Sequence, residues 1–219
     1  GDRFEFFPAV SLGWLVSNEK FFEPLSDVVS SLKLRGSYGL VGSDETGPSN
    51  APHFLYIDQV QVTGNGRPGF TTGENLNVSY YGPVVQQWAV QNGGWERVKK
   101  LDVGFDMELF RELSITFDFF YDKRYNILLH REAWPQSLGF HEAKPWSNKG
   151  KVDNWGYEVS TNWRKQFTKD LTVDFRGTFT YTQNKYIDVD EPIYPYVWQT
   201  ATGKPLNRRN GYIAEGLFQ

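Results

Sequence analysis

The sequence lacks cysteine, which excludes disulfide bonds, thiol nucleophiles and cysteine-ligated metals. No basic excess is present either: 23 Lys and Arg stand against 26 Asp and Glu, a net charge of -3, which argues against a nucleic-acid binder. No apolar run approaches the ~18 residues that a membrane-spanning helix requires, and no signal-peptide pattern is present. The only methionine is Met107, so we expect a processed product or a piece of a longer protein.

Aromatic residues are abundant, and they favour β-structure. The 219 residues include 17 Phe, 12 Tyr and 8 Trp, or 17% aromatic, and aromatic side chains suit pleated, half-buried surfaces. Apolar and polar residues alternate strictly from Leu101 to Leu109. After a short turn expected at Arg111 and Glu112, the alternation resumes from Leu113 to Tyr121, which predicts a β-hairpin.

Alternation along the whole chain predicts an all-β fold of antiparallel, up-and-down strands. The connections between the strands are alternately short turns and long loops, which is typical of a transmembrane β-barrel. A structureless loop of about 50 residues would be unusual in a compact soluble domain. Six strands are too few to close a barrel, because the smallest bacterial barrels have about eight. We therefore expect 1–219 to be part of a larger transmembrane barrel, with strands 4–16, 31–41, 95–110, 113–128, 151–165 and 171–186 and long outer loops 42–94, 129–149 and 187–219.

The two faces of this predicted sheet differ in chemistry. We expect the apolar face to contact lipid, with aromatic belts at both strand ends, and the polar face to line the lumen. The charges on the polar face have mixed signs, so cross-strand pairing is their default role. They are Lys33, Arg35, Asp102, Asp106, Glu108, Asp118, Asp122, Glu158, Arg164, Asp174 and Arg176.

Six stretches, in order along the chain, carry the pattern of one family. They read FFPAVSLGW at 6–14, LKLRGSYG at 32–39, WERVKKLDVGFD at 95–106, DFFYDKRYNILL at 118–129, NKGKVDNWGYE at 148–158, and GKP, GY and EGLF within 203–218. Together they resemble the SusC/RagA branch of TonB-dependent outer-membrane transporters. Trp155 departs from the family pattern, which has a small or charged residue there, and 41–94 matches little.

The resemblance implies a barrel of about 22 strands with a plugged lumen, of which this chain would form about a quarter. The plug, the TonB-contacting segment and the closing strand would lie outside it. The implied function is import of glycans or peptides across the outer membrane of a Gram-negative bacterium. The implied partners are TonB and a SusD-like surface lipoprotein, and we expect no cofactor and no enzymatic activity.

Aromatic residues in the predicted loops are the candidate ligand contacts. Exposed aromatic faces stack on sugar rings and also anchor partner interfaces, although packing of the loops against each other is the more ordinary role for any one of these residues. The candidates are Tyr80, Tyr81, Trp88, Trp134, Trp146, Tyr194, Tyr196 and Trp198.

Other functional classes stay open as alternatives. A soluble β-sandwich that binds carbohydrate is the second hypothesis, and a glycosidase-like enzyme is the third, because a catalytic carboxylate pair depends on separation in space. The three histidines lack metal-ligand spacing, so we expect no metal site there. Asp188, Asp190 and Glu191 would suit Ca²⁺ chemically, or would form a solvated acidic tip.

Overall fold

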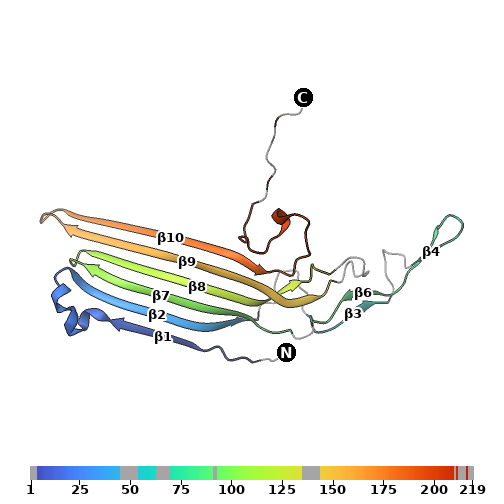
Figure 1. Cartoon of the computed structure of the whole chain (residues 1–219), viewed down its shortest axis with the longest axis horizontal. Coiled ribbons are helices and arrows are strands. Elements are labelled where there is room, and N and C mark those ends of the chain that lie inside the picture. Colours follow the sequence, from blue (N-terminus) through green and yellow to red (C-terminus); the bar gives the residue numbers. More distant parts are fainter. Residues whose placement is uncertain are drawn as a thin grey trace.

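A computed structural model describes residues 4–44, 54–62, 70–90, 93–134, 144–209, 211 and 216. Six long strands form one antiparallel sheet in the order β1-β2-β7-β8-β9-β10, side by side in Figure 1. This confirms the predicted up-and-down arrangement. The described part of the sheet is open, since β1 and β10 are its two edges. The strands are β1 (Ala9–Leu15), β2 (Val29–Ser43), β7 (Glu96–Leu109), β8 (Leu113–His130), β9 (Trp146–Gln166) and β10 (Thr172–Asp188).

The bounds differ most from those expected at the start of the chain's first strand and at the β8–β9 connection. Extended pairing begins at Ala9 rather than at residue 4. β8 continues to His130 and β9 begins at Trp146 because these two residues still pair. The connection between these strands is therefore shorter than the loop expected at 129–149.

The short-turn end of the sheet lies at the left in Figure 1. β1 and β2 are joined through two short 3-10 helices, η1 (Val16–Asn18) and η2 (Lys20–Leu25). Phe110 and Arg111 form the centre of the β7–β8 turn, with positive φ values of 54° and 58°. The amide of Glu112 donates to the carbonyl of Leu109 at 3.0 Å, which makes a two-residue hairpin turn of the kind that matches strand twist. The turn lies one residue earlier than predicted.

At the opposite end, the long connection between β2 and β7 contains two small ribbons. β3 (Gln59–Gln61) pairs with β6 (Val84–Gln87), and β4 (Phe70–Thr72) pairs with β5 (Val78–Tyr80). The stretch expected as a plain loop at 42–94 is thus partly β-structure. In the described residues, no helix has the length and apolar character needed to cross a membrane.

The apolar face of the sheet is defined here by a row of rings across four strands. Phe105 on β7 stacks on Phe117 of β8 at 5.5 Å between centroids. Phe117 lies 6.3 Å from Tyr157 on β9, which lies 5.4 Å from Tyr181 on β10. No side chain in the described residues is less than 2% exposed. The ring row therefore forms a surface rather than an enclosed core.

The polar face, on the other side of the same strands, is organised by Arg35. Its guanidinium donates to Asp106 at 3.2 Å and to Asp118 at 2.7 Å. Asp118 is on β8, beyond β7, and the side chain reaches it over Gly104, where a Cβ atom would overlap the Asp118 carboxylate. Thr116 donates to Asp106 at 3.1 Å and completes the network.

Candidate functional site

An irregularity in the β8–β9 pairing reverses the face of the residues that follow it. Arg124 pairs with Val152, but the next pair joins Ile127 to Gly150, so β8 carries one extra residue there. Asn126 takes a left-handed conformation at φ 58°. Such a bulge redirects side chains. Before the bulge, the odd-numbered residues of β8 lie on the apolar face. After it, Ile127 and Leu129 lie on the polar face instead.

Gly150 gives these two apolar side chains room. A Cβ atom built on Gly150 would lie 2.9 Å from the Ile127 Cβ and 2.8 Å from the Leu129 Cδ2. Both side chains therefore pack directly over the backbone of β9. The polar face, charged in its middle, becomes apolar where β8, β9 and β10 approach their long-loop ends.

An open cleft of about 930 Å³ lies over this apolar floor. Its size is at the upper end of the range for small-molecule sites. Carboxylates, cations and amides surround the floor. The main apolar contributors are Ile127, Leu129, Val152, Val189, Tyr194 and Leu206.

The segment 189–206 folds back after β10 (Figure 1). Five of its residues line the cleft, namely Val189, Glu191, Tyr194, Ala201 and Leu206. The amide of Gly203 donates to the carbonyl of Tyr186 at 2.7 Å, and the amide of Tyr186 donates to Lys204 at 3.0 Å. The amide of Leu206 donates to the Asn184 Oδ1 at 2.8 Å. Three hydrogen bonds thus hold the end of this segment along β10.

Glu191 links two parts of the segment 189–206 through hydrogen bonds. Its two carboxylate oxygens accept the amides of Ala201 at 2.7 Å and Thr202 at 2.9 Å. Burial raises the pKa of Glu191, but these hydrogen bonds outweigh it and hold that pKa below its ordinary value. The carboxylate is therefore ionised and fully engaged at neutral pH.

Asp190 anchors the same segment to the β8–β9 connection. Its carboxylate accepts Arg131 Nε at 2.9 Å and Lys149 Nζ at 3.1 Å, and its side chain is only 7% exposed. Burial raises the pKa of Asp190, but Arg131 and Lys149 lower it by more. The pKa of this carboxyl group therefore lies below its ordinary value. The amide of Ala133 donates to the Asp190 carbonyl at 2.9 Å.

These contacts argue against a Ca²⁺ site at Asp188, Asp190 and Glu191, because each carboxylate already has partners within the protein. Asp190 is neutralised by two cations, Glu191 caps backbone amides, and Asp188 faces Lys151 at 3.8 Å. Within the described ranges no group of three or more His, Cys, Asp and Glu residues is arranged to hold a metal ion. His53 and His141 lie outside the described residues.

Charged residues around the cleft are compensated by the protein itself. Arg124 donates to Glu96 at 2.8 Å. Asp122 lies 3.8 Å from Lys100, and Glu132 pairs with Lys144. Lys151 and Asp188 are also paired, whereas the cleft-lining carboxylate of Glu191 accepts backbone amides and makes no ion pair in the described residues.

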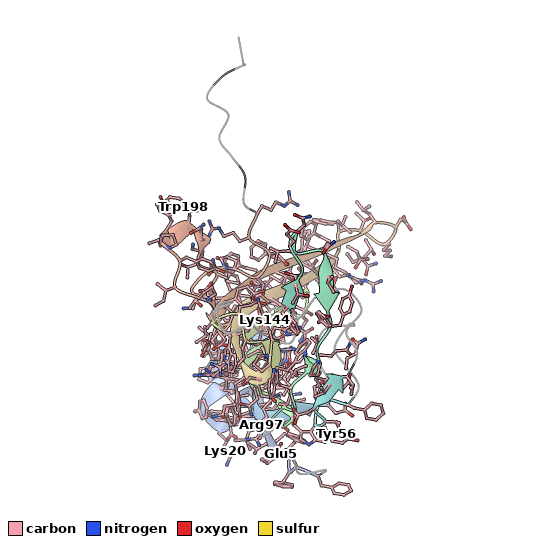
Figure 2. All side chains as sticks on the ribbon, turned by 90° about the vertical axis from the view of Figure 1, so that its right-hand side faces the viewer. Glu5, Lys20, Tyr56, Arg97, Lys144 and Trp198 are labelled. Carbon is pink, nitrogen blue, oxygen red and sulfur yellow. The ribbon has the colours of Figure 1, made fainter. Side chains whose placement is uncertain are left out.

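The eight aromatic residues expected as ligand contacts are spread over several environments. Tyr194 lines the cleft. Tyr196 directly precedes η4 (Val197–Gln199) and stacks at 4.3 Å on Trp198 within it, and both rings are more than half exposed. Figure 2 looks along the strands from the long-loop end and has Trp198 at the periphery, well away from Tyr56.

The other five candidates lie elsewhere. Tyr80 stacks on Phe70 at 4.8 Å within the β4–β5 ribbon, and Tyr81 follows it, exposed. Trp88 follows β6 and is half-buried, and Trp134 faces the guanidinium of Arg131 at 5.9 Å. Trp146 is buried on β9 against His130, with 3.7 Å between ring centroids.

Sequence reasoning missed the floor of the cleft. Ile127 and Leu129 follow a strand whose alternation places odd-numbered residues on the apolar face. The available signal was Asn126, because asparagine tolerates the left-handed conformation that a bulge requires.

Comparisons with known proteins agree on one family. The model of the family "TonB dependent receptor-like, beta-barrel" matches residues 1–215. TonB-dependent receptor P39 of Formosa agariphila is 30% identical over 218 residues, which cover 97% of this chain and 19% of that protein. TonB-dependent receptor SusC of Bacteroides thetaiotaomicron is 27% identical over 185 residues, which cover 84% of this chain and 17% of SusC.

A solved structure has the same fold. The RagAB peptide transporter structure superposes with a TM-score of 0.63 at 20% identity, over 90% of this chain and 20% of that chain. The chain thus spans about a fifth of the length of the relatives that it matches.

Proposed function

The chain belongs to the TonB-dependent receptor β-barrel family, and from that premise we propose that it forms part of an outer-membrane transporter that imports glycans or other oligomeric nutrients. The observation that carries the proposal is the two-faced sheet, which the family model matches along almost its whole length. In a barrel of this kind the apolar face meets lipid and the polar face lines the lumen. The cleft then lies on the route of a solute, near the outer mouth.

Two alternatives receive no support from the described residues. A β-sandwich needs a second sheet packed on the first, whereas the described strands outside the six-stranded sheet form only two-stranded ribbons. The relatives are named receptors, which favours transport over catalysis.

The partner of the proposed transporter is a SusD-like surface lipoprotein, with TonB supplying energy through a region outside this chain. Ile193 and Val197 support an external partner, because they are 102% and 82% exposed at the long-loop end. Of the eight aromatic residues, the exposed Tyr196 and Trp198 are the best placed to contact the partner, and Tyr194, which lines the cleft, is the best placed to contact the solute.

The test is uptake by cells that carry the full-length protein. We expect the protein in the outer-membrane fraction, with the lipoprotein co-purifying. Uptake of labelled oligosaccharides and peptides should stop when the protein is deleted or the proton-motive force is collapsed, while surface binding persists after collapse. Recovery in the soluble fraction, or unchanged uptake in the deletion strain, would contradict the proposal.

A further inference from the structure

We propose that the apolar side of the sheet binds one anionic, phosphate-bearing lipid of the outer leaflet, with its headgroup at Lys99 and Lys123 and an acyl chain in a groove over Gly36. This site goes beyond the proposed transport function and rests on it only in that the apolar face meets lipid. Lys99 on β7 lies opposite Lys123 on β8. Asp153 on β9 lies between Lys123 and Lys185 of β10. These four residues form a row across the long-loop end of the sheet.

The row lies on the same side of the sheet as the stacked rings. Lys123 follows Tyr121 by two residues, and such residues share a face of a strand. The Tyr121 hydroxyl donates to Asp153 Oδ2 at 2.8 Å, which places Asp153 on that side as well. Lys99 and Lys185 share it because residues directly opposite each other in antiparallel strands lie on one face. The row therefore follows directly on the aromatic band.

The row carries three positive charges and one negative charge. In the described part of the chain, Lys99, Lys123 and Lys185 are exposed and take no part in an ion pair. The Lys99 Nζ lies 5.7 Å from the centre of the Tyr125 ring. Like charges directly opposite each other destabilise a strand pair. An anion bound at Lys99 and Lys123 would relieve this repulsion, and phosphate oxygens are strong acceptors for ammonium groups.

The two ends of the same face differ in charge, and the difference points to one leaflet. At the short-turn end, Lys165 follows Trp163 by two residues on this face, and its Nζ lies 3.0 Å from Glu112. That lysine is therefore neutralised within the protein. The long loops of a bacterial barrel face the outside, so the uncompensated lysines lie at the level of the outer-leaflet headgroups. Clusters of cations at that level attract anionic lipids.

An open groove of about 610 Å³ lies on the apolar face below the row. Leu101, two residues from Lys99, lines it. Gly36 forms part of its floor, because a Cβ atom there would have no neighbour closer than 3.8 Å. Its register partners Leu12 and Val103 stand on either side. A hydrocarbon chain in this groove gains dispersion contacts from the walls as well as from the floor.

One lipid molecule can occupy both features. Lys99 and Val103 are four residues apart on β7, which is about 13 Å along a strand. An acyl chain that descends from a phosphate at Lys99 therefore passes Leu101 and reaches Gly36. Free phosphate would use the lysines alone, and a lipid without net charge would use the groove alone.

The experiment is lipid binding to the delipidated full-length transporter, measured by native mass spectrometry. The probes are dioleoyl phosphatidylglycerol, which is anionic, and dioleoyl phosphatidylcholine, which has the same chains and no net charge. We expect the anionic lipid to bind about tenfold more tightly or better. Dihexanoyl phosphatidylglycerol, with short chains, should bind about tenfold more weakly than the dioleoyl form. Inorganic phosphate in millimolar excess should not displace the dioleoyl lipid.

Two variants assign the binding to this site rather than to another part of the barrel. Lys99→Gln combined with Lys123→Gln should lower the affinity for phosphatidylglycerol about tenfold and leave phosphatidylcholine unchanged. Gly36→Leu fills the groove, so it should weaken both lipids and keep the preference between them. Lys169→Gln, at the exposed short-turn end, is the control for charge. Gly13→Leu is the control for the added side chain, because its Cβ would meet nothing closer than 3.7 Å on the polar face.

The outcomes separate this site from the transport proposal. Equal binding of the two dioleoyl lipids, or a preference that survives the double lysine variant, would overturn the headgroup assignment. Unchanged binding in Gly36→Leu would overturn the groove assignment, and displacement by inorganic phosphate would show an anion site without a lipid. Each of these results leaves transport standing if cells still import oligomers. Recovery of the full-length protein in the soluble fraction would reject both proposals.

Discussion

The two faces of the sheet are made from the same strands, yet they are stabilised in different ways. On the apolar face, Phe105, Phe117 and Tyr157 stack across neighbouring strands and depend on an apolar environment outside the protein. On the polar face, Arg35 connects β2 to β7 and β8 through charge. The comparison teaches that one face is an exposed aromatic surface suited to an apolar environment, while the charges of the other face are paired within the protein.

The largest expected effect comes from a charge on the apolar face. Phe117→Lys should lower the free energy of unfolding of the full-length barrel by about 3–5 kcal/mol, because a lysine facing lipid is costly and the ring contacts are lost. Urea titration in lipid vesicles measures it. Thr178→Lys, on the polar face, is the control and should change stability by less than about 0.5 kcal/mol. Similar losses for both variants would show that the faces do not differ in environment.

The next effect comes from removing the space under Arg35. In Gly104→Ala the new methyl group would overlap the Asp118 carboxylate and the Phe117 carbonyl, and overpacking costs about 1–3 kcal/mol. Gly13→Ala is the matched control on the same face, because its Cβ would meet nothing closer than 3.7 Å. Equal stability of the two variants by urea titration would contradict the close approach.

A smaller effect concerns the long-loop end of the polar face. The folded-state pKa of Asp190 is lowered, so its stabilisation is complete above the unfolded value of about 3.9 and is lost as pH falls through the folded value. Asp190→Asn should therefore speed hydrogen exchange in 199–206 at pH 7, by about tenfold for a loss of about 1.4 kcal/mol. The difference from wild type should vanish in acid.

The control for Asp190 is Asp170→Asn at the exposed short-turn end. This variant should leave exchange in 199–206 unchanged at every pH. A pH-independent difference in the Asp190 variant would mean that packing, rather than charge, holds the segment.

The smallest effect tests the Arg35 network itself. A double-mutant cycle with Arg35→Met and Asp118→Asn should give a coupling energy of about 1 kcal/mol, since both side chains are partly exposed and screened. The cycle measured in high salt should give a smaller value. A coupling energy near zero in low salt would mean that Arg35 and Asp118 are close together without stabilising the fold.

Much of the fold could be predicted because period-2 alternation is a local signal. The six long strands, their antiparallel order and the resemblance to the SusC/RagA branch of TonB-dependent transporters are all confirmed. The ribbons within 42–94 were missed because three- and four-residue strands carry too little alternation to register.

The cleft was missed for a different reason. A single extra residue in β8 changes the face of Ile127 and Leu129, and a one-residue shift leaves the composition of the strand unchanged. The ion pairs of Asp190 join residues far apart in sequence, which no local pattern reports. Aromatic content alone therefore identified Tyr194 but not the apolar floor beside it.

The ribbons inside the long connection also bear on how the sheet assembles. β7 and β8 are joined by a two-residue turn, whereas β2 and β7 are separated by residues 44–95. Closing a flexible loop of that length costs about 3 kcal/mol more entropy than closing the short turn. Pairing β3 with β6 brings Gln59 next to Gln87, so with this ribbon in place only the residues on either side of it remain to be closed between β2 and β7. The small ribbons thus shorten the effective loop between these two strands and lower the entropy cost of closing it.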